Sequence, residues 1–210
     1  MPRSHKSAVE RLQELPEVFT LNTVAAMLDC DTGNASTYIA RWKDSGLVKS
    51  LGPRTGIHFN LLKNPQADQD KRMEAIGYLF PGAMIGGVSA VHAAGWTTQF
   101  PRQTEIIIPK RRSFPAVDDA LITTRPLPWI REARNWIASS GPVPWLDPAF
   151  ALADCIKNDV WHPDPDDLEW DEIDAQRLQL AFRYFDIPTP EDWAEEIEHL
   201  SRSGQDDLFM

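Results

Sequence analysis

Residues 34–48 combine polar and cationic side chains at a spacing that could contact double-stranded DNA. On a helical wheel, Ala35, Ile39, Trp42 and Gly46 fall on one face, which we expect to pack into a core. The opposite face is small, polar and cationic, as a helix in the DNA major groove requires. The candidate DNA contacts on this helix are Asn34, Ser36, Thr37, Arg41 and Lys43.

These side chains suit different parts of a duplex. Arginine can bind guanine edges or hold phosphate, so Arg41 is a candidate for either contact. Asn34 and Thr37 lie near the start of the helix, where they can reach base edges or phosphates. The helix dipole favours a phosphate at that end, so we expect the DNA backbone to approach there.

A basic hairpin is expected directly after this helix. Residues 47–51 and 57–61 alternate between apolar and polar side chains like two strands, and residues 52–56 join them as a wing. Lys49, Arg54 and His58 could contact backbone phosphate from this hairpin.

Two shorter helices are expected to position the recognition helix. The first covers residues 7–15, with Val9 and Leu12 facing inward, and the second covers residues 23–28 with Asn22 as its N-cap. Residues 29–33 then form the turn. Residues 1–64 are therefore expected to form a winged helix-turn-helix that binds DNA. A three-helix unit with a hairpin can also serve as a protein-interaction module, which is the alternative.

A linker is expected at residues 65–70, followed by a second domain over residues 71–210. In it, a helix begins at Ser89 or Gly87 and stops at Gly95, and strands are expected at residues 104–109 and 121–124. The expected fold class is α+β: a winged helix-turn-helix, then a small α/β domain with an acidic helical end. Between the strands, Lys110, Arg111 and Arg112 form a possible second patch for nucleic acid or a partner.

Charge is distributed unevenly along the chain. The net charge is -10, yet residues 1–64 carry about +2, residues 65–135 about +2, and residues 136–210 about -14, counting Lys and Arg against Asp and Glu. The first two-thirds can therefore approach a polyanion. Helices with apolar stripes, such as Leu178, Phe182 and Phe185, predict that the acidic third is folded and that its charge is a solvated face.

The second domain resembles a family of bacterial regulators, the AbiEi-type antitoxins. The matching residues are Gly87, Ser89, Ala90, His92, Gly95, Gln99 and the strand 105–109, followed by the helix start at residues 147–154. The resemblance implies a repressor of its own operon that also neutralises a nucleotidyltransferase-like toxin. Whether the toxin is contacted directly stays open, and the acidic end is not part of the matched pattern.

A catalytic alternative rests on the same stretch. Gly86 and Gly87 precede a strand with Glu105, as in nucleotidyltransferases, which carry two carboxylates two residues apart for divalent metal. Here Glu105 has no such partner, and the adjacent Asp118 and Asp119 would point to opposite faces of a strand. We therefore expect no enzyme activity, no metal and no cofactor, and a packing role for the glycines.

The remaining signals favour a cytoplasmic protein. No apolar run approaches the ~20 residues that span a membrane, and the first residues lack the apolar core of a secretory signal. Cys30 and Cys155 match no metal or disulfide pattern. The expected partner is operator DNA, with a toxin as a possible second partner.

Overall fold

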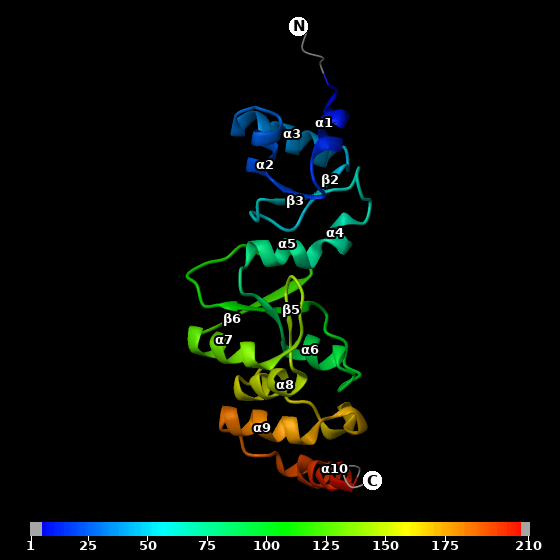
Figure 1. The fold of residues 1–210 in the computed structure, drawn as a ribbon, viewed down its shortest axis with the longest axis vertical. Coiled ribbons are helices and arrows are strands. Elements are labelled where there is room, and N and C mark those ends of the chain that lie inside the picture. The colour runs from blue at the N-terminus through cyan, green and yellow to red at the C-terminus, as the bar shows by residue number, and fades with distance from the viewer. Residues whose placement is uncertain (1–5, 207–210) are drawn as a thin grey trace. The chain divides into compact units, whose positions relative to one another are not determined.

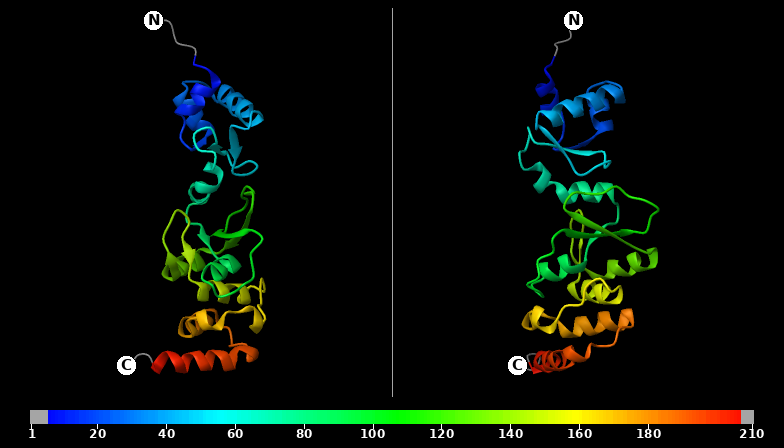
Figure 2. Two further views of the ribbon diagram at one scale, coloured as in Figure 1. Left: turned by 90° about the vertical axis from the view of Figure 1, so that its right-hand side faces the viewer. Right: turned by 180° about the vertical axis from the view of Figure 1, so that it is seen from behind.

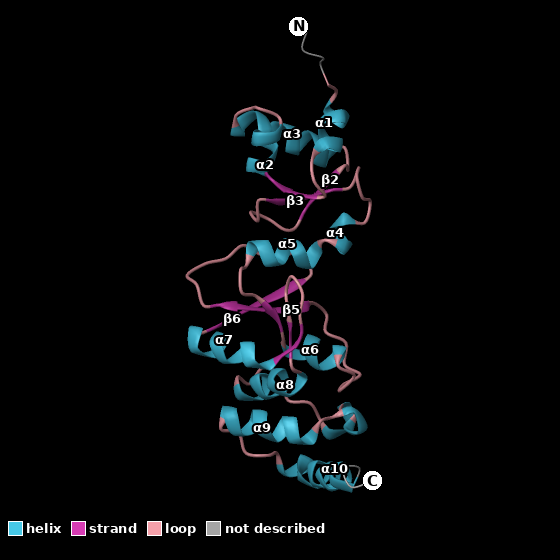
Figure 3. Ribbon diagram, in the orientation of Figure 1, coloured by secondary structure: helices cyan, strands magenta, loops and turns pink. Residues whose placement is uncertain are grey.

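The computed structural model describes residues 6–206, without the side chains of residues 201–206. Those residues form a mixed α+β fold with two separate sheets, as expected (Figures 1 and 3). The chain divides into two compact units. The first comprises Met1–Pro81 with Arg112–Asp118, and the second comprises Gly82–Arg111 with Asp119–Met210.

The first unit contains three helices, a three-stranded antiparallel sheet and two further helices. Its elements are α1 (Ala8–Glu14), β1 (Val18–Thr20), α2 (Leu21–Met27), α3 (Thr32–Asp44), β2 (Val48–Ser50), β3 (Ile57–Asn60), α4 (Ala67–Asp70) and α5 (Arg72–Leu79). The strand order is β1-β3-β2. The strands β2 and β3 lie where the sequence predicts the hairpin.

Side-chain caps set the helix starts in this unit, and two of them differ from expectation. The hydroxyl of Thr20 accepts from the backbone N–H of Thr23, so α2 begins at Leu21, and Asn22 is not its cap. The carboxylate of Asp31 accepts from the N–H of Asn34. The helix α3 therefore begins at Thr32, inside the segment expected to be a turn.

The core of the first unit confirms most of the predicted inner face of α3. Ala35, Ile39 and Trp42 are buried, and the indole N–H of Trp42 donates to the carbonyl of Ala8 at 3.0 Å. Gly46 is exposed with φ of 70°, so it ends the helix instead of packing. Val9 is 44% exposed, so its predicted inward orientation is wrong.

The segment expected to be a linker is structured. Residues 67–70 form α4, and Ala67 is fully buried. Packing of this side chain ties the segment to the first unit, which continues through α5 to Pro81. The first unit thus extends past the boundary expected at residue 64.

The second unit is built on a five-stranded mixed sheet in the order β6-β5-β4-β8-β7. Its strands are β4 (Met84–Ile85), β5 (Thr104–Pro109), β6 (Ala120–Arg125), β7 (Ile137–Ser139) and β8 (Trp145–Leu146). Its helices are α6 (Gly87–Ala93), α7 (Leu127–Ala133), α8 (Pro148–Lys157), α9 (Ala175–Phe185) and α10 (Ala194–Asp206). Short 3-10 turns occupy Arg134–Trp136, Pro165–Asp167, Trp170–Glu172 and Glu191–Trp193.

Helices of the acidic third are layered on this unit, with α8, α9 and α10 following one another in Figure 2. The apolar stripe of α9 is buried, as predicted, with Phe182 and Phe185 each at most 8% exposed. Trp193 and Ile197 join the same core. The acidic third is therefore folded. None of the helices in the described residues is long and apolar enough to cross a bilayer.

Candidate nucleic-acid interface

The predicted outer face of α3 is exposed. Thr37 and Arg41 lie opposite the buried residues of the helix, and Ser36 and Lys43 are exposed on its flank. The hydroxyl of Thr37 donates to the carbonyl of Gly33 at 3.0 Å, one turn back along the helix. The exposed surface thus carries the hydroxyl of Ser36, the Thr37 hydroxyl already used by the backbone, and the cationic side chains of Arg41 and Lys43.

At the start of α3, a carboxylate occupies the place where a phosphate was expected. The side-chain amide of Asn34 donates to Asp31 at 2.6 Å, in addition to its backbone N–H at 2.8 Å. The backbone hydrogen bond from Asn34 lowers the pKa of Asp31, so this carboxylate stays ionised at neutral pH. A negative charge at this helix end disfavours a phosphate there, so the phosphate contact near Asn34 stays a prediction that Asp31 opposes.

A groove brings together four predicted contacts. Its volume is about 560 Å³, and it lies between the C-terminal half of α3 and the hairpin. The predicted residues that line it are Lys43, Lys49, Arg54 and His58. The sequence placed these residues on separate elements, and the fold gathers them in one concave surface.

Acidic residues that sequence reasoning missed moderate the charge of this groove. Lys49 forms an ion pair with Asp68 of α4, and Asp118 lines the groove itself. Both acids come from segments distant in sequence, so no local signal pointed to them. Arg54 is exposed at the wing with φ of 60°. Lys43 and Arg54 are therefore the stronger candidates for phosphate contacts in the groove.

His58 is half-buried beside Phe19, with ring centroids 5.6 Å apart, and its Nδ1 hydrogen bonds with the Ser50 hydroxyl at 3.0 Å. Burial, and then the nearby charge of Lys43, lower the pKa of His58 from 6.5 to about 4. The ring is therefore neutral at pH 7. It does not attract phosphate as a cation at pH 7, and a contact of His58 with phosphate would there be a hydrogen bond from the neutral ring.

The base of the wing is held by a segment far along the chain. Backbone N–H of Asp118 donates to the carbonyl of Leu51 at 3.2 Å. Gly52 lies so close that a Cβ there would meet the carbonyl oxygen of Ala116 at 2.6 Å. Residues 116–118 thus fix the start of the wing, and only glycine fits at position 52.

We expect Gly52→Ala to destabilise the hairpin by about 2 kcal/mol, because backbone atoms must move to admit the methyl group. Hydrogen exchange of the β2 and β3 amides measures this loss. The control is Gly141→Ala, where a Cβ would meet its nearest neighbour, the carbonyl oxygen of Val143, only at 3.8 Å. Unchanged exchange in the Gly52 variant would show that residues 116–118 do not brace the wing.

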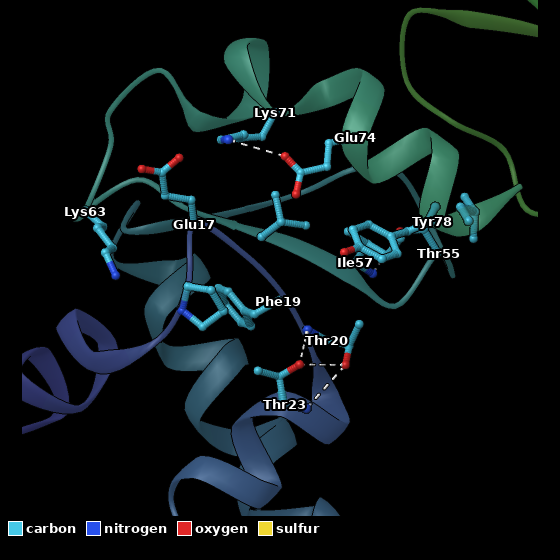
Figure 4. A pocket seen from close by; sticks show the side chains of 13 residues that line it. Glu17, Phe19, Thr20, Thr23, Thr55, Ile57, Lys63, Lys71, Glu74 and Tyr78 are labelled. Carbon is cyan, nitrogen blue, oxygen red and sulfur yellow. Dashed lines mark hydrogen bonds and ion pairs between the residues drawn. The ribbon is translucent and has the colours of Figure 1, made fainter. Parts of the chain in front are cut away.

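A larger pocket of about 880 Å³ lies between β1, the wing and α5 (Figure 4). One end carries Glu17 and the ion pair between Lys71 and Glu74, whose charged atoms are 3.3 Å apart. Tyr78 and Ile57 line the other end. None of the predicted DNA contacts lines this pocket, so it is separate from the groove.

The predicted second basic patch falls at the boundary between the units. Lys110, Arg111 and Arg112 are all exposed. The backbone N–H of Lys110 donates to the carbonyl of Arg125 at 2.8 Å, which extends the pairing of β5 with β6. Arg111 belongs to the second unit and Arg112 to the first. These residues therefore do not form one surface of a single unit.

Small residues of the second unit serve packing, as the sequence predicts for its glycines. A Cβ on Gly87, whose φ is 58°, would overlap the Glu105 carboxylate. Glu105 accepts from the N–H of Val88 at 3.1 Å, and Ser89 Oγ accepts from the N–H of Glu105 at 2.9 Å. His92 hydrogen bonds to the carbonyl of Thr97 at 3.1 Å. Gly87, Ser89 and His92 therefore each have a role in packing or hydrogen bonding within the second unit.

The second unit also contains buried or half-buried charged groups: Glu105, Arg125 and Asp154. The guanidinium of Arg125 binds the carboxylate of Asp154, with Nη2 and Oδ2 2.7 Å apart, and Asp154 is 1% exposed. Burial raises the pKa of Glu105. Within residues 6–206, no three His, Cys, Asp or Glu side chains are grouped so that they could hold a metal ion.

Comparison with known proteins identifies a likeness of fold. No protein-family model matches the chain, and no curated protein matches it. Among solved structures, the crystal structure of the RV2827C protein from Mycobacterium tuberculosis is similar, with a TM-score of 0.51 and 16% sequence identity. The match covers 94% of this chain and 75% of that one. At this identity the likeness concerns the fold alone.

Proposed function

We propose that this chain is a DNA-binding transcriptional regulator whose first unit is a winged helix-turn-helix. The observation that carries the proposal is the exposed face of α3, which leads into a groove lined by Lys43, Lys49 and Arg54. The element order from α1 to β3, three helices followed by an antiparallel hairpin, supports the same interpretation.

In the proposed complex, α3 enters the major groove and the wing follows the backbone. Arg41 is the candidate for base recognition, and Arg54 and Lys43 are candidates for phosphate. Because Asp31 repels phosphate, the phosphates approach the C-terminal half of α3 rather than its first turn. The proposed complex forms in the cytoplasm and needs no metal or cofactor.

A gel-shift with DNA from upstream of its own gene, run at increasing salt, tests the proposal. Binding should weaken steeply with salt, because each phosphate contact releases counterions. Absence of any shift at the lowest salt would exclude this function.

We expect Arg41→Ala to abolish the preference for the operator, with a loss of about 10- to 100-fold, because a base contact is worth about 1–3 kcal/mol. Lys49→Ala should weaken all sequences alike, and only slightly, since Lys49 is already paired with Asp68. Competition gel-shifts with operator and unrelated DNA separate these effects. Lys157→Ala, an exposed lysine of the second unit, is the control. Equal behaviour of the Arg41 and Lys49 variants would contradict the assigned roles.

We further propose that the regulator is the antitoxin of a toxin–antitoxin pair. Support comes from the sequence resemblance around Gly87, Ser89 and Gln99. The test is co-expression with a neighbouring nucleotidyltransferase-like gene: this chain should restore growth that the neighbour alone arrests. If growth stays arrested, or no such neighbour exists, the antitoxin role fails while the DNA-binding proposal stands.

One observation favours the alternative, a protein-interaction adaptor. The face of α3 and its groove include Asp31 and Asp118 among the cations, so its charge is mixed. A surface of mixed charge suits a protein partner better than it suits DNA, which is uniformly negative. A stable protein complex that survives the loss of Arg41, together with no affinity for DNA, would identify the adaptor.

A further inference from the structure

The strand β6 is an edge of the second unit's sheet, and half of its backbone groups face away from that sheet. Thr104 N–H donates to the carbonyl of Asp119 at 3.2 Å, and Lys110 N–H donates to that of Arg125 at 2.8 Å. Odd-numbered residues of β6 therefore pair with β5. The N–H and C=O groups of the alternate residues, Ala120, Ile122 and Thr124, point outward.

No other strand of the described chain pairs with this edge. The carbonyl of Thr124 accepts from Nη1 of Arg125 at 3.2 Å, which leaves one of its two lone pairs. The buried centre of β5 is at most 2% exposed, from Ile106 to Ile108, whereas the middle residues of β6 are half-exposed. Water thus reaches the outer side of the strand.

Several common protections of an edge strand are missing from β6, and its one charged residue, Arg125 at the C-terminal end, is paired with Asp154. The strand is six residues long, pairs with β5 without a register shift, and contains neither proline nor lysine. Leu121 is 42% exposed on it. The opposite edge, β7, has three residues and an irregular register. Of the two edges of this sheet in the described residues, β6 is therefore the better suited to accept another strand.

We propose that β6 pairs antiparallel with β6 of a second copy of this chain, joining two five-stranded sheets across a two-fold axis. The axis passes through Ile122, which faces its own copy, and Ala120 faces Thr124 of the second copy. In this register all three outward residues of each strand have a partner. If the two-fold axis passed through residue 121 or 123 instead, only two of the three would have one. The proposed register also places Asp119 across from Arg125 of the second copy, whose guanidinium stays bound to Asp154 of its own chain, so the pairing rests on the backbone groups.

The interface consists mainly of backbone hydrogen bonds and the covered side chain of Leu121. Such a small interface belongs to the weak class, so the dissociation constant is on the order of 10 µM. The consequence for DNA binding rests on the proposed function: a dimer presents two α3 helices to two half-sites of an operator. The pairing itself is tested without DNA, so the two proposals fail separately.

Sedimentation equilibrium of the full chain, from about 1 to 200 µM, measures the dimer. Leu121→Lys should raise the dissociation constant at least tenfold, because lysine on an edge strand disfavours pairing. Leu180→Lys is the matched control, since Leu180 is 50% exposed on α9, away from the edge. A monomer at every concentration, or equal effects of both variants, would overturn the proposal.

A cross-link tests the register. In a Cys30→Ser background, which leaves only the buried Cys155, Ile122→Cys should form an intermolecular disulfide under mild oxidation. Paired residues of this kind lie about 5.5 Å apart at Cα, which suits a disulfide. Thr124→Cys should not, because its own copy lies about 14 Å away along the strand. Equal cross-linking at both positions, or none at position 122, would contradict this pairing.

Discussion

Asp154→Asn is expected to lower the free energy of unfolding of the second unit by about 3–5 kcal/mol, because it leaves a buried guanidinium without its counter-charge. Both oxygens of Asp154 accept from Arg125, at 2.7 to 3.1 Å, and the side chains are only 2% and 15% exposed. The same carboxylate accepts from the amide of Asn158 at 3.0 Å. Few other single changes remove as many buried interactions.

Urea unfolding followed by tryptophan fluorescence measures the loss. Of the eight tryptophans, Trp42 alone lies in the first unit, so the signal reports mainly on the second. Asp159→Asn is the matched control: its side chain is 94% exposed, and its pair with His162 contributes little. Equal stability of the Asp154 and Asp159 variants would show that the buried pair is not needed.

A double variant separates two contributions to the free energy of unfolding: the cost of leaving one buried charge unpaired, and the net contribution of the ion pair. Replacing Arg125 by methionine and Asp154 by leucine removes both charges, and apolar replacements of buried pairs are often nearly neutral. We expect the double variant to recover most of the stability lost in Asp154→Asn. A double variant as unstable as the single one would mean that specific hydrogen bonds, and not charge burial, dominate.

Local periodicity was sufficient to predict α3 and the hairpin of the first unit, but not α4, which lies in the expected linker. The spacing of Ala35, Ile39 and Trp42 predicts the buried face of α3 because a helix repeats every 3.6 residues. Alternation predicts β2 and β3 in the same way. Helix starts were less predictable, since both Thr20 and Asn22 are good caps and only the tertiary structure selects between them.

Contacts between distant segments could not be predicted. Asp68 pairs with Lys49 and residues 116–118 brace the wing, although neither segment lies next to the hairpin in sequence. The same limit applies to the candidate site. Residue types indicated which side chains could contact DNA, but only the fold shows that Asn34 is bound to Asp31. Charge near a site depends on such neighbours, so a basic motif alone overstates its positive potential.

Burial of His58 makes the stability of the first unit depend on pH. Alternation in the hairpin suggests an exposed residue, yet the ring is half-buried beside Phe19, and its pKa falls to about 4. In the unfolded chain the ring takes up a proton as pH falls through about 6.5. Between these values the unfolded state binds more protons than the folded state, so folding weakens as pH falls.

We therefore expect acidification from pH 7 to pH 4 to destabilise the first unit by about 3 kcal/mol through His58, as the difference between 6.5 and about 4 implies. The full contribution is present above pH 6.5 and is lost as pH falls through about 4. Amide exchange in β3, corrected for the pH dependence of intrinsic exchange, measures it in the wild type and in His58→Gln.

Subtracting the variant from the wild type isolates His58 from other groups that titrate in the same window. Burial raises the pKa of Glu105, so that carboxyl contributes stability at low pH that is lost as pH rises, opposite in sign to His58. It is present in both proteins and cancels in the difference. An NMR titration of the ring gives its pKa directly. A midpoint near 6.5, or equal pH dependence in both proteins, would show that His58 is charged at mildly acidic pH and restore it as a cationic phosphate contact there.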